Sequence, residues 1–214
     1  MYELRRNLNR ILSPMLGPGR LIYENSFGAF SLPAFCMRNN YQGHIMDVTT
    51  LDISFECPQP FWEAAVPSRV GLAYVEGGLQ FPMETPSLFG VLGYRDTVVN
   101  DGDAQSPVAI TMDGGAINPV LRNVTTGEFI KLARHVNLHD KLYINTDPEH
   151  LSVSLLTLNP ATNEYESENA FGFLTQDSTL WQLQPGVNII KFSSDNENQM
   201  VGIRIEFSRR FAGV

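Results

Sequence analysis

The stretch Val201–Phe207 reads VGIRIEF, with an apolar side chain at every second position and glycine, arginine and glutamate between them. A period of two places the apolar side chains on one face of a β-strand and the polar ones on the other. A helix would instead need apolar residues three or four positions apart. This segment therefore predicts a strand that covers a hydrophobic core.

Similar segments precede it from residue 97 onward, with a spacing near ten residues, and turn-forming residues separate them. About eight short strands in succession are typical of an all-β sandwich or barrel. No strand alternates with a long helix, which argues against a doubly wound α/β fold. The turns are expected at Asn100-Asp101-Gly102-Asp103, Asp113-Gly114-Gly115, Thr125-Thr126-Gly127 and Gln184-Pro185-Gly186, and the strands at 107–112, 120–124, 129–132, 141–146, 151–158 and 188–192.

The first part of the chain differs. Apolar residues at helical spacing predict an amphipathic helix that ends near Ser13, because Pro14 and the Gly17-Pro18-Gly19 run disfavour its continuation. Val48–Phe55 alternates like a half-buried strand and ends at Cys57-Pro58. Residues 58–93 are rich in proline, glycine and aromatic residues and predict irregular structure and an extended connection. The helix positions expected on the apolar face are Leu4, Leu8, Ile11, Leu12 and Met15.

Together these patterns predict a mainly β chain with two domains. Residues 1–96 would form an N-terminal α+β domain with an extended connection, and residues 97–214 a C-terminal antiparallel β-sandwich.

Composition and charge limit the function classes. Hydrophobic residues are 43% and charged residues 18%, so the chain can bury a sizeable core. A formal charge of −8 would repel phosphate backbones, which argues against nucleic-acid readout as the main activity. The basic residues near the start could contact a partner, but a solvated helix face is the favoured interpretation; they are Arg5, Arg6, Arg10 and Arg20.

No stretch has the ~20 consecutive apolar residues of a membrane helix. The start lacks the apolar region of a signal peptide, so we expect synthesis and folding in a cytoplasm. Cys36 and Cys57 are too few for a disulfide framework, and we expect buried free thiols, with a single bridge as the alternative.

Several stretches of the second half, in order and spacing, resemble the second domain of siphophage distal tail proteins, and residues 1–62 resemble the first domain of that family. The stretches are Asn100–Asp103, Asn118–Asn123, Thr125–Glu128, His139–Thr146, Leu183–Asn188 and Arg210–Val214. The family's first domain usually opens with strands before this helix, whereas here Met1 already lies in it. The sequence is therefore expected either to cover part of that domain or to represent a short member.

The resemblance implies a structural virion protein of a phage or prophage tail. Copies would form a ring, commonly a hexamer, that joins the tail tube to the tip or baseplate and its receptor-binding proteins. The expected location is the tail tip of a virion assembled in the host bacterial cytoplasm. The second domain would be a galectin-like or carbohydrate-module-like sandwich outside the ring.

We find no catalytic motif, and the chain is expected to be non-enzymatic, with no cofactor and no metal. His135 and His139 lack a third ligand, and Asp101-Gly102-Asp103 lacks the later positions of a calcium loop, which favours a turn. Alternating Glu164, Glu166 and Glu168 predict a strand face or a solvated hairpin rather than a glycosidase pair.

Two hypotheses remain open. In the first, the chain is an assembly subunit, and the expected interface residues are Phe61, Trp62, Tyr74 and Phe89, because aromatic residues dominate interface energetics. In the second, the sandwich is a carbohydrate-binding module that contacts host cell-wall polysaccharide through an exposed aromatic residue flanked by polar ones. Trp181 could stack on a sugar, but packing in a core or interface is the favoured interpretation.

Overall fold

The computed structural model describes residues 2–45, 48–72, 74–75, 93–196 and 201–214. It divides into two compact units, one formed by residues 1–66 with 210–214 and the other by residues 67–209. The predicted domain ranges, 1–96 and 97–214, stay a prediction; the compact units divide the chain after residue 66 and again after residue 209.

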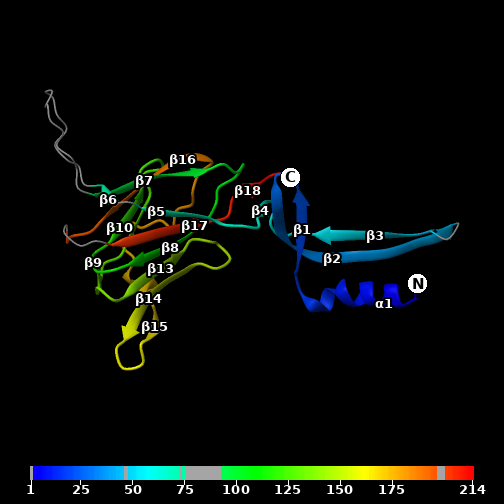
Figure 1. Ribbon diagram of the computed structural model, residues 1–214, viewed down its shortest axis with the longest axis horizontal. Coiled ribbons are helices and arrows are strands. Elements are labelled where there is room, and N and C mark those ends of the chain that lie inside the picture. The colour runs from blue at the N-terminus through cyan, green and yellow to red at the C-terminus, as the bar shows by residue number, and fades with distance from the viewer. Residues whose placement is uncertain (1, 46–47, 73, 76–92, 197–200) are drawn as a thin grey trace. The chain divides into compact units, whose positions relative to one another are not determined.

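The first unit contains one helix and a five-stranded antiparallel sheet (Figure 1). The long strand β2 pairs with β1, β3 and β4, and β4 pairs with β18 near the C-terminus. The elements are α1 (Tyr2–Ile11), the 3-10 turn η1 (Pro14–Leu16), β1 (Gly19–Asn25), β2 (Gly28–Ile45), β3 (Val48–Glu56), β4 (Trp62–Ala64) and β18 (Arg210–Phe211). The predicted helix and the predicted strand at Val48–Phe55 are both confirmed.

The second unit carries the strands predicted around VGIRIEF. Its larger sheets have the orders β11-β10-β16-β7-β6 and β15-β14-β13-β8-β17-β5, and β12 pairs with β9. The elements are β5 (Ser68–Leu72), β6 (Tyr74–Val75), β7 (Gly93–Asn100), β8 (Val108–Asp113), β9 (Ala116–Ile117), β10 (Val120–Asn123), β11 (Phe129–Lys131), β12 (His135–Val136), β13 (Lys141–Asn145), β14 (Ser152–Asn159), β15 (Glu164–Asn169), the 3-10 turn η2 (Phe171–Phe173), β16 (Gly186–Ser193) and β17 (Gly202–Phe207).

The two larger sheets share one hydrophobic core, which makes this unit an antiparallel β-sandwich. Ile203, Ile205 and Phe207 of β17 are buried in it, while Arg204 of the same strand is exposed, as the alternation predicts. Residues of the other sheet, among them Leu121 of β10 and Ile190 of β16, belong to the same cluster. The predicted mainly β fold class is therefore confirmed.

The segment 58–93 was expected to be irregular, and its described part contradicts that expectation. It contains β4, β5 and β6, which pair with β2 and β18, with β17, and with β7. These strands are two to five residues long. Their partners lie far away in the sequence, so local proline and glycine content could not reveal them. Residues 76–92 lie outside the described residues.

Cys36 and Cys57 are both free thiols, as expected, but each is half-buried rather than buried. Among the described residues, no helix is long and apolar enough to cross a membrane.

Candidate functional site

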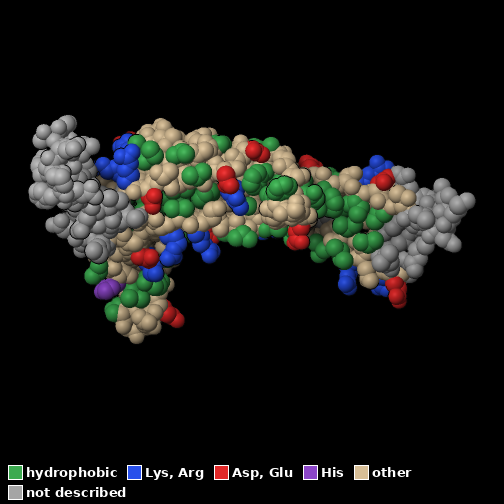
Figure 2. Space-filling view, turned by 45° about the horizontal axis from the view of Figure 1, so that its top comes forward, with side chains coloured by type: hydrophobic (Ala, Val, Ile, Leu, Met, Phe, Trp, Pro, Cys, Tyr) green, Lys and Arg blue, Asp and Glu red, His purple; other side chains and the backbone are tan. Residues whose placement is uncertain are grey.

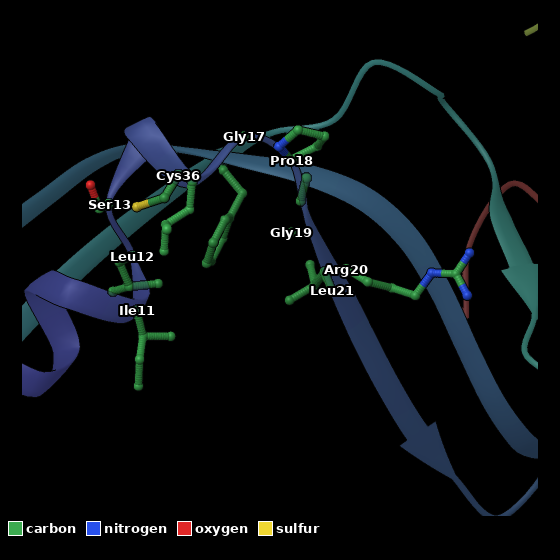
Figure 3. A pocket seen from close by; sticks show the side chains of 12 residues that line it. Ile11, Leu12, Ser13, Gly17, Pro18, Gly19, Arg20, Leu21 and Cys36 are labelled. Atoms are coloured by element: carbon green, nitrogen blue, oxygen red, sulfur yellow. The ribbon is translucent and has the colours of Figure 1, made fainter.

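The first unit contains an apolar pocket of about 300 Å³ (Figure 3). Ile11 and Leu12 line it from the end of α1, Leu21 from β1 and Cys36 from β2. The pocket lies where the chain bends between α1 and β1. Leu16 N donates to Ser13 O over 3.1 Å, and Gly17 then adopts φ 77°, a left-handed conformation that suits glycine. The chain therefore turns after α1 and continues into β1.

The apolar face of α1 is only partly covered. Leu8 and Leu12 are half-buried, but Ile11 is 67% exposed and Met15, just beyond the helix, is 95% exposed. An amphipathic helix on a complete domain buries such a stripe against its core. The predicted stripe is therefore only partly covered within the described part of this unit, and the side chain of Leu4 lies outside the described residues.

Other large apolar side chains of the first unit are exposed as well. Figure 2 shows hydrophobic side chains spread over this unit, at the right of the view, between scattered charged ones. Exposed apolar surface is one of the features that mark interaction sites. With Ile11 and Met15, the large exposed apolar residues in the described part of this unit are Leu16, Ile22, Tyr23, Phe27, Met37, Ile53, Phe55, Val66 and Val214.

Of the predicted interface residues, two belong to this unit. Phe61 and Trp62 are half-buried, and the Trp62 ring centroid lies 6.1 Å from that of Tyr23 in a tilted arrangement. Tyr74 lies in β6 opposite Tyr94, and its side chain is outside the described residues, as is Phe89. Their role in an interface stays a prediction.

Sequence reasoning missed the closure of this unit by the C-terminus. Arg210 of β18 donates two hydrogen bonds to a carboxylate oxygen of Glu63, at 2.9 and 2.8 Å, and both side chains are largely buried. Phe211 packs edge-on against Phe30, with centroids 5.3 Å apart. The only sign in the sequence was the pair Arg210-Phe211 after β17. Its strand partner, β4, lies far away along the chain.

Trp181 and Asn123 of the second unit have structural roles. Trp181 is 1% exposed, and its Nε1 donates to Leu121 O over 3.2 Å, so it belongs to the core, as favoured from sequence. Asn123 is buried and its Oδ1 accepts from Thr125 N over 3.0 Å. Its Nδ2 donates to Asn188 Oδ1 over 3.2 Å. Asn123 therefore stabilises the turn that follows β10.

The acidic candidates lie on the surface. Glu164, Glu166 and Glu168 lie in the exposed strand β15, as expected, and Glu168 makes a bidentate ion pair with Arg134 at 3.0 and 2.9 Å. Asp101 lies in a turn, as favoured, and accepts from Arg209 over 3.0 Å. Their contacts are those of surface ion pairs.

The histidines do not assemble into a centre. His135 in β12 and His139 in the following loop are both exposed. Among the described residues, no group of three or more His, Cys, Asp or Glu side chains is placed to hold a metal ion.

A family model described as "Siphovirus-type tail component, C-terminal domain" matches residues 101–211. The chain belongs to this siphovirus-type tail component family. The match spans the sandwich strands from β8 to β17 and ends at Phe211 in β18. The resemblance inferred from turn and strand residues is thereby confirmed.

Solved structures agree with the fold of this tail component. It is similar to a chain in the phage P2 baseplate in its activated conformation with Ca, and to one in the same baseplate with Sr. Each match has 12% identity and a TM-score of 0.50, and covers 100% of this chain and 75% of the other. No curated protein matches the chain. The family makes the chain a structural component of a phage tail and thus of the virion.

Proposed function

We propose that this tail component is a non-enzymatic hub subunit at the distal end of the tail. Copies associate through the first unit into a ring, with a hexamer as the expected form. The ring joins the tail tube to the tip or baseplate and to its receptor-binding proteins. The family membership and the similarity to baseplate chains support this assignment.

The observation that carries the proposal is the uncovered apolar surface of the first unit. Met15, Phe27 and Met37 expose most of their side chains. Where the structure describes the side chains of this unit, the buried apolar residues are Phe30, Leu32, Ala34 and Ala64. Burial of apolar area is the main driving force of association, so a neighbouring copy would complete this small core.

The test is the native mass of the chain, measured by light scattering behind size exclusion over a range of concentrations. A species near six times 23.9 kDa is expected. A native mass at another whole-number multiple of the chain mass would support a ring with a different number of subunits. A chain that stays monomeric at every concentration would contradict the proposal.

One observation favours a second candidate function, sugar binding by the sandwich. The outward positions of β13 include Tyr143, which is half-buried and pairs in register with Thr111 of β8 and Ser154 of β14. Arg204 of β17 lies opposite Thr111. A partly exposed aromatic side chain among hydroxyl and guanidinium groups offers a ring face for stacking and polar groups for hydrogen bonds to a sugar.

Calorimetry with a panel of cell-wall polysaccharides tests this candidate. Binding that is lost in Tyr143→Ala but kept in Tyr165→Ala, an exposed tyrosine on β15, would support it. No heat with any polysaccharide would remove it.

A further inference from the structure

A row of three cations crosses the outer face of the five-stranded sheet in the second unit. The strand pairing places Arg95 of β7 opposite Lys191 of β16, and Lys191 opposite Arg122 of β10. Phe129 of β11 ends the row opposite Arg122. Paired residues of an antiparallel sheet point to the same face. The neighbours of Lys191 on either side in β16 are buried in the core, so the row points outward, and its three cations are exposed.

This arrangement places like charges side by side. Neighbouring strands lie about 4.8 Å apart, so the row concentrates three positive charges within roughly 10 Å. Like charges that face one another across strands destabilise a sheet. The chain has 23 acidic and 15 basic residues, yet among the described residues no ion pair joins a carboxylate to the row. The row therefore offers positive charge that the described part of the chain does not neutralise.

Many other cations of the same unit do have a carboxylate partner. These pairs are Arg69 with Glu206, Arg134 with Glu168, Lys141 with Asp113 and Arg209 with Asp101. Ion pairing is thus common on this unit and is missing where the three cations of the row face one another. An anionic partner would relieve the repulsion within the row.

Arg122 is held in position without losing its charge. Its Nη1 donates to Gly127 O over 3.2 Å, and its guanidinium carbon lies 4.6 Å from the centroid of the Phe129 ring. A carbonyl and an aromatic ring carry no net charge, so the guanidinium stays cationic while its conformation is restricted. Such restriction lowers the entropy lost when a partner binds.

The same face becomes apolar further along the strands. Thr97 pairs with Ile189, and Val99 pairs with Val187, roughly 13 Å from the row. Val99 and Val187 are 54% and 55% exposed. Val124 is 41% exposed and adjoins them, since its N–H donates to Ile189 O over 2.7 Å. Cationic and aliphatic groups therefore share one outer face.

We propose that this face docks another protein, whose surface places carboxylates over Arg95, Lys191 and Arg122 and aliphatic side chains over Val99 and Val187. Protein interfaces combine apolar and polar groups in this way, and arginine is enriched in them. A phosphate polymer would match the cations but has no apolar group for the valines, and the formal charge of −8 repels it. The inference goes beyond the proposed ring, whose contacts belong to the first unit.

A second copy of the chain fits this face less well. The acidic face of β15 is the obvious candidate on such a copy, but two of its three glutamates already have partners. Glu166 accepts from Asn159, and Glu168 pairs with Arg134. The partner is therefore expected to be a different protein.

The first test measures binding by calorimetry, with a random copolymer of glutamate and alanine as the probe. The row variant carries Arg95→Gln, Lys191→Gln and Arg122→Gln. The control variant carries Arg69→Gln, Arg134→Gln and Lys141→Gln, which changes the net charge equally but leaves the row intact. We expect binding about tenfold weaker or lost in the row variant, because three exposed ion pairs are removed, and unchanged in the control. Absence of binding to the unchanged chain, or equal loss in both variants, would overturn the proposal.

A second arm separates a protein partner from other anions. Val99→Ser with Val187→Ser should weaken binding of the copolymer and leave binding of inorganic polyphosphate as it is. Polyphosphate that binds more tightly than the copolymer, with no effect of the valine changes, would mean that the row serves phosphates. A lower native mass in the row variant would mean that it contacts a second copy. Either result would overturn the proposal.

The last test needs no probe. At low salt, Lys191→Gln should raise the denaturant midpoint of unfolding, because it removes repulsion within the row. Lys141→Gln, which breaks the ion pair with Asp113, should lower it. A fall in both variants would show that Lys191 is neutralised within the chain and would overturn the proposal.

Discussion

The two units of this chain solve the problem of burial differently. In the second unit, one cluster of 23 buried apolar residues lies between two sheets. Among the described side chains of the first unit, the buried apolar residues are Phe30, Leu32, Ala34 and Ala64, and more large apolar side chains are exposed than buried. A unit with a full core is stable as a monomer, whereas a small unit with a partial one gains stability from neighbours. The sandwich therefore buries its apolar residues within itself, whereas the described part of the first unit leaves many of its apolar side chains exposed.

The largest expected effect tests the self-sufficiency of the sandwich. Trp181→Ala should lower the free energy of unfolding of the second unit by about 3–5 kcal/mol, through lost transfer energy and the cavity left behind. Denaturant unfolding followed by circular dichroism measures it, with Tyr165→Ala on the exposed strand β15 as control. An unchanged denaturant midpoint in Trp181→Ala would contradict the view that the core around Trp181 stabilises the second unit.

The matching change in the first unit should act on assembly instead. Trp62→Ala removes a half-buried ring that packs on Tyr23, and we expect it to weaken the oligomer by about 2 kcal/mol, the scale of an interface hot spot. Native mass over a concentration series measures this. Trp181 then remains as the fluorescent reporter of the second unit, whose unfolding should not shift. An unchanged native mass would remove Trp62 from the interface.

A smaller effect concerns a buried polar group of the sandwich. Asn123→Ala removes the acceptor of Thr125 N and one of the two donors to Asn188 Oδ1, the other being Gln184 N, which should cost about 1–3 kcal/mol. Gln105→Ala, which breaks an exposed contact to Gln184, is the control and should change little. Equal unfolding midpoints for the two variants would show that the Asn123 network does not stabilise the unit.

The smallest expected effect is electrostatic. A hydrogen bond from Arg69 lowers the pKa of Glu206, so the folded state favours the ionised carboxylate. The stabilisation is present above the unfolded pKa and is lost as pH falls through the folded pKa. Arg69→Met should raise the pKa of Glu206, as measured by NMR titration. The free energy of unfolding of Arg69→Met should be lower than that of the unchanged chain at neutral pH, and the two values should converge in acid.

Local pattern was sufficient where an element is long or regular. The alternation of Val201–Phe207 predicted β17, and apolar spacing with Pro14 after it predicted α1 and its end. It failed for β5 and β18, because their partners β17 and β4 lie more than a hundred residues away. It also missed the pocket, which depends on how Leu12, Leu21 and Cys36 come together from three elements.

The sequence by itself determined the mainly β class, the helix, most sandwich strands and the family, because periodicity and turn chemistry are local properties. Only the tertiary structure decided which apolar residues are covered. Trp181 and Phe27 are both aromatic residues near turn-forming ones, yet one is 1% and the other 91% exposed. Burial depends on what distant segments pack against a side chain, and the identity of the residue does not specify those segments.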